Sequence, residues 1–124
     1  MVKKTAVIIL AHGSRIKEAN NTIRKACRQI KNRNGLNIVE PAFLQLSRPD
    51  LHSAAKKVIV DAGCERVIVV PFFLFMGNHV SRDIPKAIEK EKNIYKGVEF
   101  VYTRNLSHDS RLNDIVYDCI REVL

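Results

Sequence analysis

The chain has 124 residues, 46% of them hydrophobic and 27% charged, with a net charge of +8. This length and composition are typical of one soluble domain with a core of its own, so we expect a single domain over residues 1–124. No apolar run is long enough to cross a bilayer, and the short one after Lys3 and Lys4 lacks the cleavage site of a signal peptide. We therefore expect a cytoplasmic protein without a membrane partner.

The excess positive charge lies in the first 35 residues, which hold nine basic side chains and one acid, while the remainder of the chain is balanced. A basic face of this kind attracts nucleic acid or a small polyanion, or it is simply a solvated surface. Aromatic residues make up 6% of the chain, too few for a stacking platform, and the sequence has no known nucleic-acid-binding motif. We therefore expect no nucleic-acid partner.

The first strand and the first helix are expected close to the N-terminus. Residues 5–11 (TAVIILA) form a continuous apolar, β-branched run, which predicts a strand that is covered on both faces. From about residue 16 to residue 33, apolar residues recur at helical spacing and basic residues fall mostly on the other side, which predicts an amphipathic helix. Asn34 and Gly35 are expected to end it.

A second strand and a second helix follow. Residues 37–46 predict a strand, and Pro41 inside it predicts an edge position, because proline donates no hydrogen bond to a neighbouring strand. The segment Ser47 to Asp50 has the pattern of a capping box with a proline in the first turn of the helix. The helix that it would begin is expected to end at Gly63.

The second half of the chain repeats this alternation. Residues 66–75 predict a third strand, the most hydrophobic one, and a helix is expected from about residue 80 to residue 93, with Pro85 near its first turn. Residues 98–103 predict a fourth strand, and residues 109–123 predict a last helix. That helix is expected to bury one apolar face, made of Leu112, Ile115, Val116, Cys119, Ile120 and Val123.

Strands and helices that alternate with short connections predict an α/β fold, here a single doubly wound domain with a four-stranded parallel sheet and helices on both faces. With the second strand at an edge, the expected strand order is 2-1-3-4. In such sheets ligands bind beyond the carboxyl ends of the strands, where the strand order reverses. Here that point lies between the first and third strands.

Both strands that meet at this point are followed by a histidine. His12 follows the first strand in the motif AHGSR, and His79 follows the third strand in the motif FMGNHVSRD. Imidazole is a common ligand of cobalt, nickel, iron and zinc, and a pair would leave most coordination positions open, as suits a site that must pass its metal on. Taken singly, each histidine is more often a loop or capping residue. His52 and His108 are expected at the same end of the sheet, where surface positions explain them more simply.

Residues beside the two histidines add binding groups. Gly13, directly after His12, and Gly77, two residues before His79, permit close approach of a flat or bulky ligand. Phe75 and Met76 could form an apolar wall, and Arg15 and Arg82 could hold carboxylates. The alternatives are ordinary core packing for the apolar pair and solvated helix ends for the arginines.

The motif AHGSR, together with PFFLFMGNHVSRDIP after the third strand, resembles the small sirohydrochlorin chelatases, single-domain members of the class II chelatases that include the small sirohydrochlorin cobaltochelatase. The resemblance covers nearly the whole chain, and the two motifs at this separation are specific, whereas HGSR alone would be weak. It implies an enzyme that inserts a divalent metal ion into sirohydrochlorin, a tetrapyrrole with eight carboxylates, without ATP or another cofactor. Cobalt, and so cobalamin biosynthesis, is the expected case, with nickel and iron(II) as alternatives.

The resemblance also assigns roles to residues. His79 would be a metal ligand, and His12 would be both its partner and the proton acceptor of the reaction. The small members are homodimers and the long members fuse two such halves, so a homodimer is expected. Other residues would contact the substrate or support the site: Arg48, Leu74, Phe75, Met76, Gly77 and Asn78 around the macrocycle, and Ser14, Arg15 and Arg82 as accessory groups.

The chain departs from the family pattern at the end of the second strand. Family members usually read FLELSEP there, whereas this chain has Gln45 and Arg48 in place of the two acids. Their loss leaves the metal preference and the rate open, and Arg48 could instead bind a carboxylate of the substrate. A carrier that binds metal or tetrapyrrole without catalysing insertion therefore stays an alternative. Phosphotransfer through His12 is a weaker one, because Ala11 stands where a histidine phosphatase would have arginine.

Overall fold

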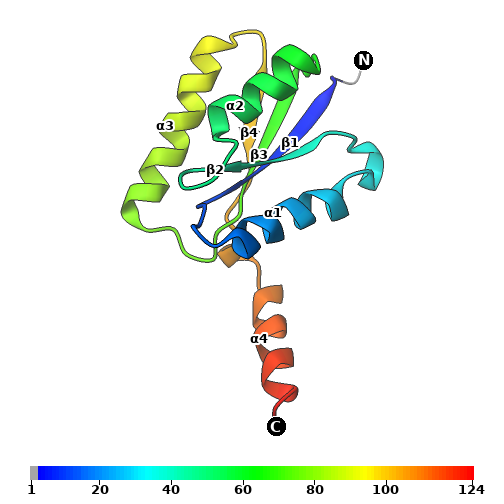
Figure 1. The fold of residues 1–124 in the computed structure, drawn as a ribbon, viewed down its shortest axis with the longest axis vertical. Coiled ribbons are helices and arrows are strands. Elements are labelled where there is room, and N and C mark those ends of the chain that lie inside the picture. The colour runs from blue at the N-terminus through cyan, green and yellow to red at the C-terminus, as the bar shows by residue number, and fades with distance from the viewer. Residues whose placement is uncertain (1–2) are drawn as a thin grey trace.

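Four parallel strands form one sheet in the order β2-β1-β3-β4 in this computed structural model, which describes residues 3–124 (Figure 1). The expected strand order is confirmed, and Pro41 lies in an edge strand, as predicted. The third strand ends at Pro71, earlier than expected, and the apolar residues after it form a loop. The strands are β1 (Thr5–Ala11), β2 (Val39–Phe43), β3 (Arg66–Pro71) and β4 (Glu99–Tyr102).

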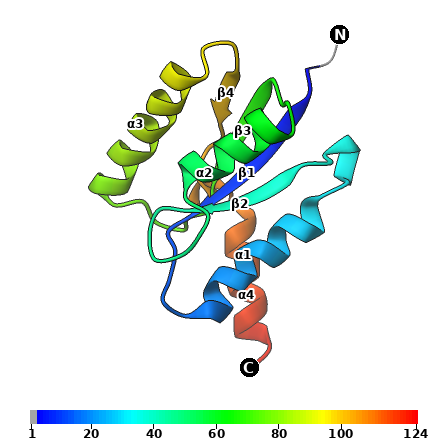
Figure 2. The same ribbon diagram turned by 45° about the horizontal axis from the view of Figure 1, so that its top comes forward.

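Helices lie on both faces of the sheet, as predicted (Figure 2). One face carries α2 (Leu51–Lys56), which continues in a π-helical turn to Asp61, and α3 (Asn78–Ile94). The other face carries α1 (Lys17–Ile30). A short 3-10 turn, Arg33–Gly35, precedes β2. A second one, Leu106–His108, precedes the last helix, α4 (Arg111–Arg121). No helix within residues 3–124 is both long enough and apolar enough to span a membrane.

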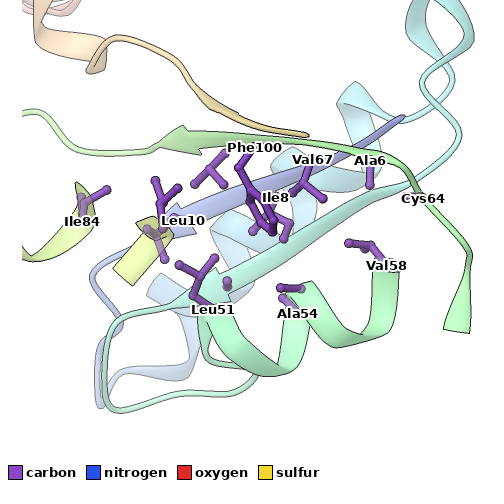
Figure 3. Packing of buried hydrophobic residues seen from close by; sticks show 14 of the residues in the cluster. Ala6, Ile8, Leu10, Leu51, Ala54, Val58, Cys64, Val67, Ile84 and Phe100 are labelled. Carbon is purple, nitrogen blue, oxygen red and sulfur yellow. The ribbon is translucent and has the colours of Figure 1, made fainter. Parts of the chain in front are cut away.

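The larger core cluster lies between the sheet and the helices α2 and α3 (Figure 3). Side chains alternate along a strand, so Ile8 of β1 and Val67 of β3 point to this face and pack with Leu51 of α2. A smaller cluster on the opposite face includes Ile23 and Cys27 of α1. Burial of each such aliphatic side chain contributes about 1.5–3 kcal/mol, and the two clusters together fix the strand ends that carry the candidate site.

The last helix forms as predicted, but it does not bury its apolar face. α4 projects beyond the carboxyl edge of the sheet (Figure 1), and in the described part of the chain none of its side chains is buried. Ile115 and Ile120 are 56% and 47% exposed, and Cys119 is exposed, unlike Cys27 and Cys64. An amphipathic pattern predicts that a helix has an apolar face, but it does not say which surface covers that face.

The N-terminal cap of α2 differs from the prediction. Asp50, not Ser47, is the cap, because its carboxylate accepts a 2.8 Å hydrogen bond from the N–H of Ser53. This bond is the main reason that the pKa of Asp50 lies below its usual value. The capping-box pattern fails because Pro49 stands before the helix and not in its first turn.

α3 begins earlier than predicted, at Asn78. It therefore includes His79 in its first turn, and Pro85 lies inside the helix rather than near its start. Proline has no N–H to donate to the carbonyl one turn back, so one helical hydrogen bond is lost. Ile84 and Ile88 are buried against the sheet on either side of this proline and hold the helix in place.

Candidate active site

The segments that carry the two predicted metal ligands lie at the same edge of the sheet. β1 and β3 are neighbouring parallel strands, with Leu10 paired to Pro71, so both end at the carboxyl edge. His12 comes directly after β1, and His79 lies in the first turn of α3, which follows β3 through a loop (Figures 1 and 2). Both imidazoles are exposed and so are open to a ligand from solvent. Coordination of one ion by both stays a prediction.

His12 is oriented by two neighbours. Its ring stands edge-on to Phe73, with ring centroids 6.3 Å apart and an interplanar angle of 70°. The side-chain amide nitrogen of Gln45 lies 3.3 Å from Nε2 of His12. An amide N–H can only donate, so in this contact Nε2 accepts in the tautomer that carries its hydrogen on Nδ1. Neutral imidazole can bind a metal ion or take up a proton, and at Nε2 either would displace the Gln45 amide.

Gly13 lets the loop after β1 approach the loop after β2. Its φ of +92° lies in the left-handed region, and a Cβ added there would collide with the backbone oxygen of Gln45. The N–H of Gln45 in turn donates a 3.1 Å hydrogen bond to the carbonyl of His12. The close approach of the Gln45 backbone therefore explains the glycine at position 13, whereas the sequence analysis attributed it to close approach of a ligand. Gly77 differs, because a Cβ there would meet open space.

A buried asparagine, which the sequence analysis missed, holds the loop that contains Ser14. Asn20 is 7% exposed, accepts a 2.9 Å hydrogen bond from the N–H of Ser14, and donates one of 2.7 Å to its carbonyl. The Ser14 hydroxyl accepts a 3.0 Å hydrogen bond from the N–H of Ile16. Ser14 is thus a structural residue of this loop. The signal available in the sequence is a polar residue on the otherwise apolar stripe of the first helix.

Arg24 of α1 holds the segment that carries Arg48. Its guanidinium donates to the carbonyl of Arg48 at 3.0 Å and to the hydroxyl of Ser47 at 3.3 Å, and it lies 5.2 Å above the ring of Phe43. The side chain of Arg48 is exposed, and with Gln45 it borders a hollow of about 560 Å³. Arg48, the predicted carboxylate-binding residue, is therefore held at the border of a hollow and stays open to solvent.

The loop predicted to contact the macrocycle is open to solvent. Leu74 and Phe75 are 53% and 89% exposed, whereas Met76 is half-buried against the larger core cluster. Gly77 is exposed and is the N-cap of α3, and Asn78 is the first residue of that helix. An aromatic side chain as exposed as Phe75 gains nothing from folding, so it suits contact with another molecule.

The remaining histidines have different surroundings. His108 borders two hollows, one of about 550 Å³ with Leu74 and Phe75 and one of about 400 Å³ with Met76. It therefore lies beside the predicted macrocycle loop. His52 instead places its Nδ1 2.6 Å from a carboxylate oxygen of Glu91, which is 2% exposed. That pair joins α2 to α3.

Comparison with known proteins gives the family. The CbiX family model matches residues 6–123. This chain belongs to the CbiX family. The resemblance seen in its two histidine motifs is thereby confirmed.

The CbiX-family chain has relatives of two lengths. It is 35% identical to a sirohydrochlorin cobaltochelatase of Methanococcus maripaludis, covering 91% of this chain and 95% of that protein. It is 36% identical to a chloroplastic sirohydrochlorin ferrochelatase of Arabidopsis thaliana, covering 95% of this chain but 52% of that protein. Among solved structures, the sirohydrochlorin chelatase SirB from Bacillus subtilis subspecies spizizenii in complex with cobalt has a TM-score of 0.86 at 25% identity, over 97% of this chain and 51% of that one.

The donor groups of this CbiX-family chain are few. Residues 3–124 contain no group of three or more His, Cys, Asp or Glu side chains placed to hold a metal ion. An ion bound by His12 and His79 would keep most of its positions for other ligands. Arg15 and Arg82 are exposed and form no ion pair within the described residues, so both are available to an anion.

Proposed function

We propose that this chain is a sirohydrochlorin chelatase, which inserts a divalent metal ion into the tetrapyrrole without a further cofactor. The observation that carries the proposal is membership of the CbiX family together with an exposed histidine directly after β1 and another in the first turn of α3, the helix that follows β3. Relatives that the chain covers almost completely are sirohydrochlorin cobaltochelatases.

The reaction requires two proton transfers and an exchange of metal ligands. The metal ion is a substrate, and as it enters the ring, two pyrrole nitrogens lose their protons. We assign His12 as the acceptor, because its imidazole is exposed directly after the first central strand, and neutral imidazole accepts protons near neutral pH. His79 and His12 would deliver the ion, and ring nitrogens would replace the remaining ligands stepwise.

The surface around the strand ends suits a flat polyanion. The exposed arginines Arg15, Arg48 and Arg82 can pair with peripheral carboxylates. Phe75 offers an aromatic face to the macrocycle. The net charge of +8 favours the approach of an anionic substrate, an effect that weakens with salt.

We infer cobalt as the metal, with nickel and iron(II) as the competing choices. Related proteins include both cobaltochelatases and ferrochelatases, and two imidazoles accept all three ions. Gln45 is neutral where family members usually have an acid, so it contributes no charge to attract a cation. Selection among the ions would then rest on the imidazoles and on supply.

We also infer a cytoplasmic homodimer. The support is the length of the related chelatases: this chain covers 52% and 44% of two sirohydrochlorin ferrochelatases and 51% of SirB. Two copies of this chain therefore correspond in length to one copy of those proteins. An isologous pair would be the counterpart of their two halves.

The experiment is anaerobic absorbance spectroscopy of sirohydrochlorin with cobalt, nickel or iron(II). Each metal is tested without protein, with the wild type, with the His12→Ala/His79→Ala variant, and with His52→Ala as a control histidine that is bound to Glu91. We expect multiple turnovers with the wild type and with His52→Ala, and loss of turnover in the double variant. A wild type that only matches the uncatalysed rate would reject insertion and make a metal or tetrapyrrole carrier the better description.

A further inference from the structure

α4 presents an apolar stripe that its own domain does not cover. At 100° per residue, five apolar side chains of α4 fall within one side of the helix, and Val123 continues the stripe in the turn that follows. Their exposed fractions reach 56% at Ile115 and 85% at Val123. A stripe of this size on a monomer would be unusual and marks a contact surface. The six are Leu112, Ile115, Val116, Cys119, Ile120 and Val123.

The sheet has a partly covered apolar strip on the face of α1. Ile68 and Val70 of β3 point to this face, and Val101 of β4 pairs with Ile68 and therefore points the same way. Val101 is 37% exposed, and the two β3 residues are half-buried. α1 lies over the β1 and β2 side of this face, so it leaves the strip over β3 and β4 only partly covered (Figure 2).

The flank of α1 beside the strip is small and apolar. Arg24 reaches toward the loop after β2, so it marks the flank of α1 that faces away from β3. Ala26 lies about 200° around the helix from Arg24, and Ala19 lies close to the direction of Ala26. Ala19 is exposed and Ala26 is half-buried. A helix could therefore lie along the surface made by this flank and the strip, which we call the trough, in close contact with both α1 and the sheet.

The connection to α4 directs that helix away from its own strip. Asp109 accepts a 3.1 Å hydrogen bond from Arg104, at the end of β4, and a 2.6 Å hydrogen bond from the guanidinium of Arg111, the first residue of α4. The backbone N–H of Arg111 also donates to Asp109 at 2.9 Å. This junction sets the outward course of α4 seen in Figure 1. Each copy thus presents both an exposed apolar helix and a trough that is only partly covered.

Charge at the amino-edge end of the trough suits the C-terminal end of the helix. At the amino edge of the sheet, a hollow of about 440 Å³ has Lys3, Lys4 and Arg66 as its charged lining residues, and Ile68 borders it. Helices packed on a parallel sheet run opposite to the strands, so a docked α4 would bring its C-terminal end here. Glu122 and the negative end of the helix dipole would then approach these basic groups, of which Lys3 and Arg66 also pair with Glu99.

We propose that α4 of each copy docks in the trough of a second copy, which makes an isologous dimer by helix exchange. The proposal rests on the homodimer inferred above and gives it an interface. Each copy supplies one stripe and one trough, so two identical contacts close the assembly and cover both apolar surfaces. Because the helix begins beside Phe75 and His108, the exchange also brings the partner's helix-bearing edge close to the candidate site.

The first test is the mass of the wild type and three variants by analytical ultracentrifugation across a wide concentration range. Ile115→Asp alters the stripe, Val101→Asp alters the trough, and Tyr117→Asp is a matched control on the far side of α4, with 59% exposure against 56% for Ile115. We expect a wild-type dimer whose dissociation constant rises about 100-fold or more with each of the first two changes. Tyr117→Asp should leave the dissociation constant within about threefold of the wild-type value. Far-UV circular dichroism checks that all variants fold.

The second test mixes Ile115→Asp with Val101→Asp. Under helix exchange, the mixed dimer keeps one unaltered contact, the intact helix of one copy in the intact trough of the other. It should therefore form at concentrations where each variant alone is monomeric. Absence of mixed dimers, or a dimer that neither variant weakens, would overturn the proposal.

The alkylation rate of Cys119 distinguishes helix exchange between copies from packing of α4 on its own sheet. This cysteine lies in the stripe, while Cys27 and Cys64 are buried, so it reports on cover of the helix. We expect its alkylation to slow as the concentration of protein rises. Slow alkylation at every concentration in a monomer would show closure within one chain and refute exchange. Metal insertion is measured on the same samples. A wild-type dimer that does not accelerate insertion would count against the proposed chelatase activity and not against helix exchange.

Discussion

Gly13 allows the most direct test of how the site is built. Substitution by alanine adds one Cβ to the backbone between His12 and Ser14. That atom would collide with the backbone oxygen of Gln45 and would lie 2.9 Å from its carbonyl carbon. Neither atom can rotate away as the end of a side chain would, because the N–H of Gln45 is held by the carbonyl of His12.

Two effects set the size of the loss. A residue with a side chain costs roughly 1–2 kcal/mol in the left-handed region, where Gly13 has its φ of +92°. A forced shift of well-packed neighbours costs about 1–3 kcal/mol more. We therefore expect Gly13→Ala to lower the free energy of unfolding by about 3 kcal/mol, and to lower the insertion rate, since His12 and Gln45 both move.

The control is Gly63→Ala, at the end of the second helix. Gly63 has a φ of +74°, but a Cβ there would meet nothing within 4 Å, so this variant carries only the backbone cost. Urea unfolding followed by circular dichroism gives both values, and the absorbance assay gives the rates. Equal losses of stability in the two variants, with full activity in Gly13→Ala, would refute the argument that close approach of the two loops requires this glycine.

Three further predictions concern Asn20, Asp50 and Cys27. Asn20→Ala leaves two backbone groups of the Ser14 loop unpaired and should cost about 1–3 kcal/mol, whereas Asn21→Ala, exposed beside it, should cost under about 0.5 kcal/mol in the same urea titration. Asp50→Ala should cost about 1 kcal/mol near neutral pH. Because the pKa of Asp50 is lower in the folded chain than its unfolded value of about 3.9, this contribution is lost as the pH falls through the folded pKa, so the two unfolding midpoints should converge in acid. Burial raises the pKa of Cys27 to about 11, so its alkylation should follow the rate of unfolding, and fast alkylation of the folded protein would contradict this.

The topology and the place of the site could be predicted because each depends on local signals that agree with one another. The β-branched run 5–11 and the single proline at position 41 are enough to set a central and an edge strand. The strand order then follows, and with it the edge at which His12 and His79 lie. Local pattern and tertiary packing require the same arrangement there.

The features that could not be predicted depend on contacts between distant segments. Gln45 contacts His12 only because the backbones of two loops approach each other at Gly13. Asp50 replaces Ser47 as a cap because of the path that the chain takes before α2. The exposure of α4 is of the same kind, since its periodicity is that of a buried helix. The surface that covers a helix is a property of the whole assembly.

Pro41 has a consequence for how copies of this chain can associate. The N–H of Leu44 donates to the carbonyl of Ala11 in β1, whereas the N–H of Phe43 donates to the carbonyl of Pro49 on the outer side. Along β2, the backbone N–H groups of the odd-numbered residues therefore point away from β1. Pro41 occupies one of these outward positions, where its missing N–H costs no bond to β1. A strand from another molecule would meet a gap there, so this edge resists growth of the sheet by strand addition.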